Sequence, residues 1–179
     1  MRATTGIIML CTAALALGAC TRDGGSMRGA TPAGQSASAM IRTAAGADAG
    51  KATATDVEGG VRYTLDVRDM PAGTHGAHIH MVGQCDAPDF TTAGGHWNPT
   101  TMQHGSMNPR GPHAGDLPNL IVGTDGRGTL AVTVPGQTVA GLLDADGSSI
   151  IVHAGADDLK TDPSGNSGGR IACGVFRAG

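Results

Sequence analysis

The sequence predicts an all-β domain, folded as an antiparallel sandwich or barrel. Three observations support this prediction: short segments alternate apolar and polar residues, glycine-containing turns separate them, and no stretch combines a helical period with capping residues. Aromatic residues make up only 2% of the chain, whereas 30 of its 179 residues are glycine. The core should therefore consist of aliphatic rather than aromatic side chains, which suits short strands and many turns.

The first twenty residues (1–20) are predicted to be an export leader. Arg2 supplies a positive charge, and the apolar stretch 7–17 is too short for a comfortable membrane span. Gly18 and Ala19 precede Cys20, and small residues before a cysteine resemble the lipobox of bacterial lipoproteins, in which this cysteine is lipidated. A secretory signal that is simply cleaved is the alternative. Either leader places the mature protein in the periplasm or cell envelope.

Residues 21–35 are predicted to be a flexible tether, and residues 36–179 are predicted to be the folded domain. The tether is rich in Gly, Ser, Ala, Thr and Pro and has no apolar periodicity. Thr21, rather than Asp, follows Cys20, which in the enterobacterial pattern favours the outer membrane. The net charge of −3 is too weak to indicate nucleic acid or a membrane surface, so we expect membrane contact only through a lipid anchor.

Strand signals are clearest in the segments 61–67, 129–134 and 149–153. The first two alternate with period two, as half-buried strands do, and the third is apolar throughout. Weaker candidates are 39–43 and 50–56, and turn signals lie at 58–60, 125–126 and 146–147. From about residue 84 to 119 the pattern gives way to a loop rich in Gly, Pro and His, and loops of that length inside a compact domain are usually functional or disordered.

Two of the four cysteines remain in the mature domain. Cys11 leaves with the leader, and Cys20 is either removed or lipidated. In an oxidising compartment Cys85 and Cys173 are therefore expected to form a disulfide. This bond would close a long loop and stabilise the fold by on the order of 4 kcal/mol in the chain-entropy model. Two buried free thiols are the alternative.

The seven histidines all lie between residues 75 and 153. On a strand, His78 and His80 share one face while Ile79 points the other way, and His153 ends a strand in the same manner. All-imidazole ligation favours copper or zinc over magnesium or calcium. His104, His113 and Asp116 come from the loop, and with one more histidine they could form a closed tetrahedral zinc site. The sequence therefore has enough ligands for two metals.

Several of these motifs resemble those of the Cu,Zn superoxide dismutase family. The segment 75–80 (HGAHIH) looks like the family signature HGFHIH, and 94–99 (GGHWNP) is similar to the stretch around its bridging histidine. The segment 113–117 (HAGDL) resembles the zinc loop of the family, while 153–159 and 165–175 match its C-terminal signature. The matches follow the family order over roughly residues 36–179.

The resemblance implies two metal ions that share one histidine. It implies copper on His78, His80, His96 and His153, and zinc on His96, His104, His113 and Asp116. Asp157 would join one copper histidine to one zinc histidine, Arg170 would lie beside the open copper position, and His75 would have a framework role.

The resemblance also implies a fold and an activity. The fold would be a Greek-key β-sandwich or barrel of about eight strands, with long metal-binding and electrostatic loops. The activity would be dismutation of superoxide to oxygen and hydrogen peroxide, with Arg170 and His96 as catalytic residues. One copper and one zinc per subunit would serve this reaction, which would protect the cell envelope. Superoxide is the expected small-molecule partner, and monomer and homodimer both stay open.

Some positions depart from the family pattern. Ala77 stands where the family usually has Phe, which predicts a looser local core without loss of the site. Pro163 stands where some relatives carry a guiding lysine, so electrostatic steering should be weaker or routed differently. Lys160 is either a second guiding cation beside Arg170 or a solvated surface residue. Met102 and Met107 are interpreted as packing residues rather than soft ligands for copper delivery.

Two rival interpretations lead to different functions. A non-catalytic copper-binding module on the same fold would tend to lack a copper ligand or the arginine, and neither is missing. A structural or adhesive β-sandwich at the cell surface would have no use for seven histidines.

Overall fold

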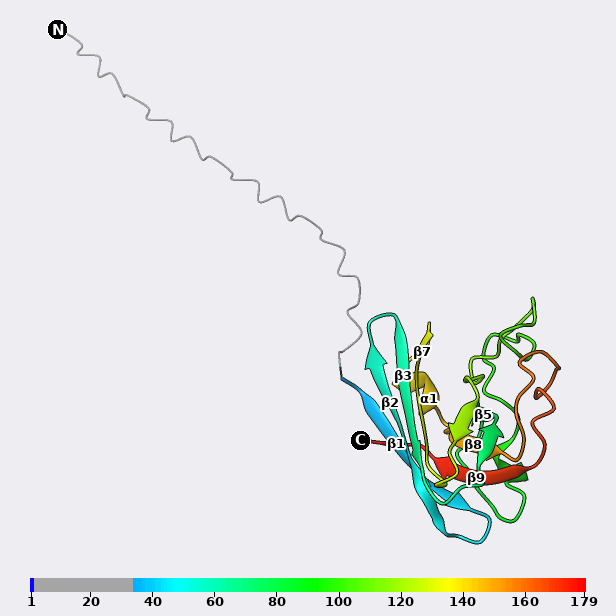
Figure 1. The fold of residues 1–179 in the computed structure, drawn as a ribbon. Helices are drawn as coiled ribbons and strands as arrows, with labels where there is room; N and C mark the ends of the chain where they lie inside the picture. Colours follow the sequence, from blue (N-terminus) through cyan, green and yellow to red (C-terminus); the bar gives the residue numbers. More distant parts are fainter. Residues whose placement is uncertain (2–33) are drawn as a thin grey trace.

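A computed structural model describes Met1 and residues 34–179, shown in Figure 1. Residues 2–33, which comprise all of the predicted leader except Met1 and most of the predicted tether, lie outside the described residues. Among the residues that are described, no helix is long and apolar enough to cross a membrane.

The regular secondary structure of the described residues is almost entirely β-strand, which confirms the predicted fold class. Within Met1 and residues 34–179 all strand pairings are antiparallel, and the two helical elements, the 3₁₀ turn η1 (Thr91–Ala93) and the helix α1 (Val139–Leu142), are a single turn each. The strands are β1 (Ser36–Thr43), β2 (Asp48–Val57), β3 (Gly60–Val67), β4 (Gly73–His75), β5 (Ala77–His80), β6 (Leu120–Val122), β7 (Gly128–Pro135), β8 (Ser149–His153), β9 (Arg170–Val175) and β10 (Arg177–Ala178).

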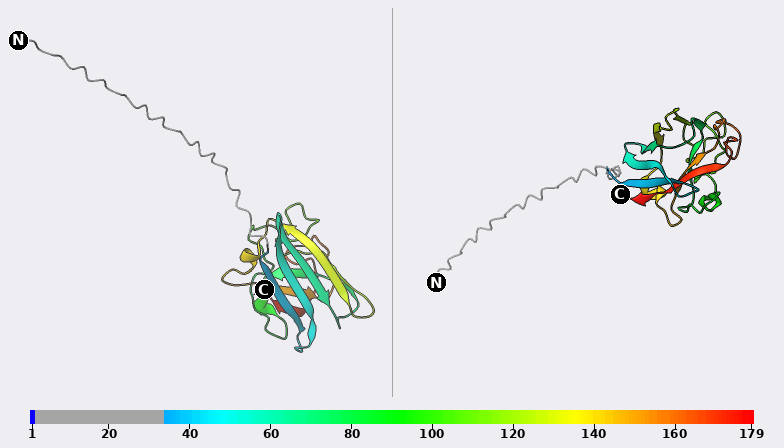
Figure 2. Two further views of the ribbon diagram at one scale, coloured as in Figure 1. Left: turned by 90° about the vertical axis from the view of Figure 1, so that its left-hand side faces the viewer. Right: turned by 60° about the horizontal axis from the view of Figure 1, so that its bottom comes forward.

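The strands form one sheet that curls into a nearly closed barrel, as the views in Figure 2 show. Their order is β4-β6-β7-β3-β2-β1-β9-β8-β5, with β10 paired to β1. The two ends of this path, β4 and β5, are joined by Gly76 alone. β1, β2 and β3 follow one another as hairpins, and β9 returns to lie beside β1, which is the connection that defines a Greek key.

The five segments predicted as strands correspond to β1, β2, β3, β7 and β8. β3 pairs with β2 over its whole length, from Val67 opposite Gly50 to Gly60 opposite Val57, as the turn signal at 58–60 predicts. β4, β6 and β9 were not predicted. β4 and β6 have three residues each, too few for alternation to be recognised, and β9 contains no regular apolar period.

The core lies between the curved walls of the barrel and is mostly aliphatic. Alanines at alternate positions of β1 and β2 leave space for larger residues such as Ile41, Leu65 and Ile150. The expectation of a core without rings is wrong in one respect: Tyr63 and Phe176 are among the largest fully buried side chains and meet edge to face at 6.4 Å. Although aromatic residues are few in this chain, these two lie in the centre of the core.

A disulfide joins Cys85 to Cys173, with the Cα atoms 5.8 Å apart, so the predicted pairing is confirmed. It fastens the loop after β5 to β9. That loop continues to the start of β6 and contains η1 as its one regular element among the described residues, in line with the predicted break at about 84–119. In Figure 1 it lies at the same end of the molecule as the loop between β8 and β9.

Candidate metal centre

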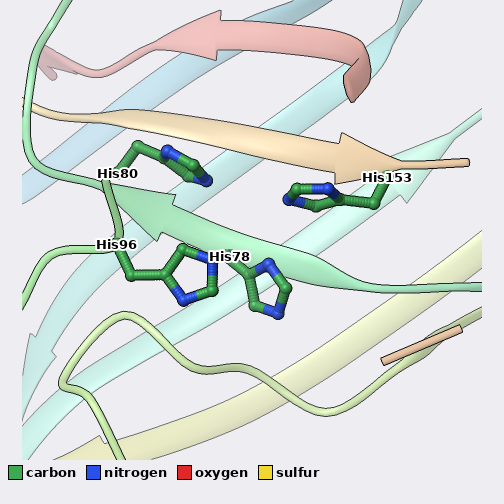
Figure 3. Close-up of side chains that lie close together, drawn as sticks. All are labelled: His78, His80, His96 and His153. Atoms are coloured by element: carbon green, nitrogen blue, oxygen red, sulfur yellow. The ribbon is translucent and has the colours of Figure 1, made fainter. Parts of the chain in front are cut away.

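Four histidines converge where the long loop after β5 meets the barrel (Figure 3). His78 and His80 come from β5, His153 ends the neighbouring strand β8, and His96 comes from the long loop, where it pairs with His80 in an isolated β-bridge. One ring nitrogen from each lies within 4.8 Å of the others, and all four side chains are buried. The strand alternation explains the pair on β5, because Ile79 between them points into the core.

Each ring has one nitrogen fixed by the protein. His80 Nδ1 donates to the Gly94 carbonyl at 2.9 Å, and His153 Nδ1 donates to the Gly168 carbonyl at 3.1 Å. Because a carbonyl can only accept, these bonds leave Nε2 of both rings without a proton when the imidazole is neutral. His78 Nε2 lies 2.8 Å from a carboxylate oxygen of Asp157, so its Nδ1 is the free atom.

The other nitrogens of these rings are unpaired. Among the described residues, five buried side-chain polar atoms make no hydrogen bond, and only Ser148 Oγ lies outside this cluster; the others are His78 Nδ1, His80 Nε2, His96 Nε2 and His153 Nε2. Unpaired buried polar atoms are rare because their desolvation is costly. Four imidazole acceptors aimed at one point fit a metal ion that prefers nitrogen ligands, such as copper.

Burial keeps three of these rings neutral, those of His80, His96 and His153. It lowers the pKa of His80 to about 2, and it lowers the pKa values of His96 and His153 to about 4. Neighbouring imidazoles and Arg170 contribute further to the lowering at His80 and His153. Metal ligation requires the neutral imidazole, so near neutral pH these three rings are in the form that can bind a metal ion.

A second cluster adjoins the first and shares His96. Asp116 Oδ1 lies 2.9 Å from His96 Nδ1, 3.0 Å from His104 Nδ1 and 3.2 Å from His113 Nδ1. The His96 and His113 nitrogens are 3.3 Å apart. Four atoms bound at about 2.0 Å to one tetrahedral ion are about 3.3 Å from each other, so this spacing fits zinc.

His78 also approaches the second cluster. Ligand atoms of His78, His96, His104 and Asp116 lie within 4.8 Å of one another. The two nitrogens of His78 are, however, directed to the first cluster and to Asp157, whereas His113 Nδ1 has only His96 and Asp116 as partners in the part of the chain that the structure describes. We therefore take His113, rather than His78, as the fourth member of the second cluster.

The carboxylate of Asp116 is held by the backbone. Its Oδ2 accepts from the backbone amides of Gly105 at 2.8 Å and His113 at 2.9 Å, which leaves Oδ1 for the histidines. Burial opposes ionisation, but hydrogen bonds with His104 and His96 hold the pKa of Asp116 well below its usual range. The group is therefore anionic and suited to a divalent cation.

Asp157 joins the two clusters. Its Oδ2 lies 2.8 Å from His78 Nε2, and its Oδ1 lies 2.9 Å from His104 Nε2. Asn119 holds the Asp157 backbone in place with two hydrogen bonds of 2.8 and 2.9 Å. Gly165 has a positive φ, and a Cβ there would collide with the Asp157 carboxylate. Asn119 and Gly165 could not be identified from the sequence, because neither residue belongs to a ligand type.

Arg170 lies beside the first cluster. Its guanidinium donates to the carbonyls of Phe90 at 2.6 Å and Gly94 at 2.7 Å, and Gly94 also accepts from His80. A cavity of about 430 Å³ opens here to solvent. Its lining comprises His80, Gly95, His96, Asn98, His113, His153, Pro163, Ser164, Gly168 and Arg170.

The remaining residues singled out from the sequence lie elsewhere. His75 is buried between the carbonyls of His153 and Pro71 and belongs to neither cluster. Lys160 is exposed and does not line the cavity, which agrees with a solvated lysine. Met102 and Met107 are exposed, so their interpretation as packing residues is wrong. Ala77 is fully buried in the core.

Comparisons with known proteins agree with this geometry. The family model for copper/zinc superoxide dismutase matches residues 48–176. A copper–zinc superoxide dismutase of Caulobacter vibrioides is 43% identical over 149 residues, covering 79% of this chain and 86% of that protein. One from Aquifex aeolicus is 43% identical over 136 residues, covering 72% and 79%.

Solved structures show the same likeness. A superoxide dismutase-like protein from Bacillus subtilis superposes with a TM-score of 0.73 at 39% identity, covering 77% of this chain and 96% of that one. The copper/zinc superoxide dismutase of Brucella abortus superposes with a TM-score of 0.65 at 28% identity, covering 79% and 99%.

Proposed function

The chain belongs to the copper/zinc superoxide dismutase family, and from this premise we propose that it converts superoxide to oxygen and hydrogen peroxide. The observation that carries the proposal is the set of four buried, unpaired imidazole nitrogens beside an arginine-lined cavity. A non-catalytic copper-binding module would not need the arginine, and an adhesive sandwich would not need the unpaired nitrogens.

We assign the two clusters to different ions. Copper would be held by His78, His80, His96 and His153, and zinc by His96, His104, His113 and Asp116. When bound, copper supplies the one-electron redox change that dismutation requires, and zinc supplies a fixed positive charge. His96 takes part in both sets through its two nitrogens.

Arg170 binds and orients the substrate in this proposal. Superoxide is a small anion, and Arg170 is the one cationic side chain among the described residues that line the cavity, His residues aside. Two of its N–H groups are used to fix the guanidinium on backbone carbonyls, so the charge stays in place as the anion enters. Burial lowers the pKa of Arg170, but an arginine stays protonated throughout the physiological range.

Histidine 96 is the group placed to hold and move a proton. Its Nε2 belongs to the first cluster and its Nδ1 faces Asp116, so the ring can take a proton on Nε2 while Nδ1 stays anchored. The product peroxide requires protons, and a residue lining the cavity is within reach of the substrate.

Superoxide consumption by the purified protein tests this function. We expect protein loaded with copper and zinc to consume superoxide, protein stripped of copper to lose the activity, and copper to restore it. Protein that binds one copper and one zinc but leaves superoxide untouched would contradict the enzymatic proposal and favour a copper-binding role.

Export is proposed on the sequence of residues 1–20, and the disulfide supports it because such bonds persist in oxidising compartments. Residues 21–35 would then tether the domain 36–179, through a lipid on Cys20, to the cell envelope. Mass spectrometry of the membrane fraction tests the lipid: a diacylated Cys20 supports the anchor, and an unmodified cleaved N-terminus contradicts it. Sedimentation of the soluble domain distinguishes monomer from homodimer.

A further inference from the structure

The single helical turn between β7 and β8 is firmly attached to the barrel. The Val139 amide donates to an Asp56 side-chain oxygen of β2 at 2.7 Å, and the Thr138 side chain caps the turn by accepting from the Gly141 amide at 3.0 Å. Val139 and Leu142 are buried in the core. Gln137, which directly precedes the capping residue Thr138, is therefore held in a fixed place relative to the barrel.

The buried carboxamide of Gln137 connects the barrel to the loop that carries the second cluster. Tyr63 of β3 donates its hydroxyl to Gln137 Oε1 at 2.6 Å, and Gln137 Nε2 donates to the Ala114 carbonyl. Because a carbonyl only accepts, the amide nitrogen must face Ala114, and its oxygen must face Tyr63. The orientation of the whole chain of hydrogen bonds is thus determined.

Ala114 lies between two members of the second cluster, His113 and Asp116. On its other side, the loop is fixed through Gly115, whose amide donates to the Trp97 carbonyl at 2.8 Å and whose carbonyl accepts from the Ile79 amide at 2.9 Å. Among the described residues, Gln137 is the hydrogen-bond partner of the Ala114 carbonyl. Loss of Gln137 would leave this carbonyl without that partner, so that its peptide group is held, within the described part of the chain, only through the Gly115 amide.

We propose that Gln137, supported by Tyr63, is a positioning residue of the zinc site. It fixes the backbone between His113 and Asp116, so that both ligand atoms meet His96 before any ion binds. This inference rests on the proposed zinc assignment. Its consequence is a zinc affinity that depends on a residue of the barrel that touches neither the metal nor its ligands' side chains.

Zinc binding by copper-free protein tests this role. Gln137→Met removes both hydrogen bonds at similar volume, Tyr63→Phe removes only the support, and Gln84→Met is the matched control on an exposed glutamine bonded to Asp86. Chelator competition should show about a tenfold higher zinc dissociation constant for Gln137→Met, the scale found for residues supporting metal ligands. Tyr63→Phe should show a smaller rise and Gln84→Met none.

Cobalt in the zinc site gives a readout that a purely structural role would not move. The visible absorption of tetrahedral cobalt should shift and weaken in Gln137→Met. The fluorescence of the sole tryptophan, Trp97, is used to check that the metal-free variant is folded under the same conditions. Unchanged zinc affinity and cobalt spectrum, with or without reduced thermal stability, would overturn the proposal. If Gln137→Met does not fold, wild-type affinity in Tyr63→Phe would overturn it. A wild-type protein that binds no zinc would contradict the proposed function itself.

Discussion

The chemistry of this site is decided at the level of single ring nitrogens. In the first cluster each imidazole uses one nitrogen to contact a carbonyl or carboxylate and presents the other, buried and unpaired, to a common point. Fixing the ring by its outer nitrogen sets the tautomer and the direction of the inner one, which is the role of groups behind metal ligands. Residue type alone would not produce this arrangement.

His153→Ala tests the division of ligands between the two clusters. His153 contributes to the first cluster only, so the variant should lose copper and all dismutation while keeping close to one zinc per chain. Metal analysis by mass spectrometry and superoxide consumption are the measurements. Met102→Leu, at an exposed position outside both clusters, is the control and should match the wild type. Activity retained by His153→Ala would show that the copper assignment is wrong.

Arg170→Ala tests the electrostatic role of the guanidinium. The second-order rate constant for superoxide should fall by about tenfold or more, since steering of a charged substrate changes on-rates by about 10 to 10³-fold. Both metals should stay bound, and the remaining rate should depend less on ionic strength. Arg170→Lys keeps the charge but not the paired carbonyl contacts. Its rate constant should lie between those of the wild type and Arg170→Ala. An unchanged rate would remove Arg170 from the mechanism.

Tyr63 is the only tyrosine, so its ionisation can be followed by phenolate absorbance. Burial, with a contribution from Asp56, raises the pKa of Tyr63 well above its ordinary value of 10.0. The native state therefore favours the neutral phenol. The unfolded state ionises first as pH rises, and the free energy of unfolding should fall above about pH 10. Native phenolate absorbance appearing at pH 10 would contradict the buried hydrogen bond to Gln137.

Among the elements, β9 and the long loop provide Arg170 and the carbonyls that hold it at the cavity. β9 begins at Arg170 and contains Cys173, and the disulfide to Cys85 fixes the loop that provides the Phe90 and Gly94 carbonyls. The disulfide therefore keeps the guanidinium of Arg170 close to the two carbonyls that accept its hydrogen bonds. It also limits the freedom of the unfolded chain over a separation of 88 residues.

The double variant Cys85→Ser/Cys173→Ser tests that dependence. Its free energy of unfolding should fall by about 2–5 kcal/mol, the usual cost of removing a native disulfide. Superoxide turnover should fall as well, because the loop that provides the carbonyl acceptors of Arg170 is no longer fixed. Denaturant titration and kinetic assays under oxidising conditions are the measurements, and chemical reduction of the wild type should reproduce both effects. A variant that is destabilised but keeps full superoxide turnover would show that the position of Arg170 does not depend on the disulfide.

The elements also show how far the sequence could predict this fold. β3, β7 and β8 are long enough for period-two alternation or an apolar run to be recognised. β9 was missed because its glycine, Gly174, packs against the Met40 backbone and interrupts the apolar pattern. α1 was missed because one helical turn shows no period. The role inferred for Gln137 depends on its contacts with β3 and with the long loop, which no local pattern reveals.

At the scale of the whole molecule, a rigid barrel supports a metal centre built largely from loops. Strand pairing places three of the histidines, and the disulfide and the carboxylates place the loop residues around them. Ligand types and family motifs were enough to select the seven residues of the two clusters. They could not show which nitrogen each ring presents, nor the supporting roles of Asn119 and Gly165, because these follow from packing.

Diffraction from crystals of the metal-loaded protein, measured at the copper and zinc absorption edges, would locate the two ions separately. We expect one copper peak among His78, His80, His96 and His153. We also expect one zinc peak among His96, His104, His113 and Asp116, with His96 between the two. A single peak, or a zinc peak ligated by His78 in place of His113, would contradict the two-metal assignment.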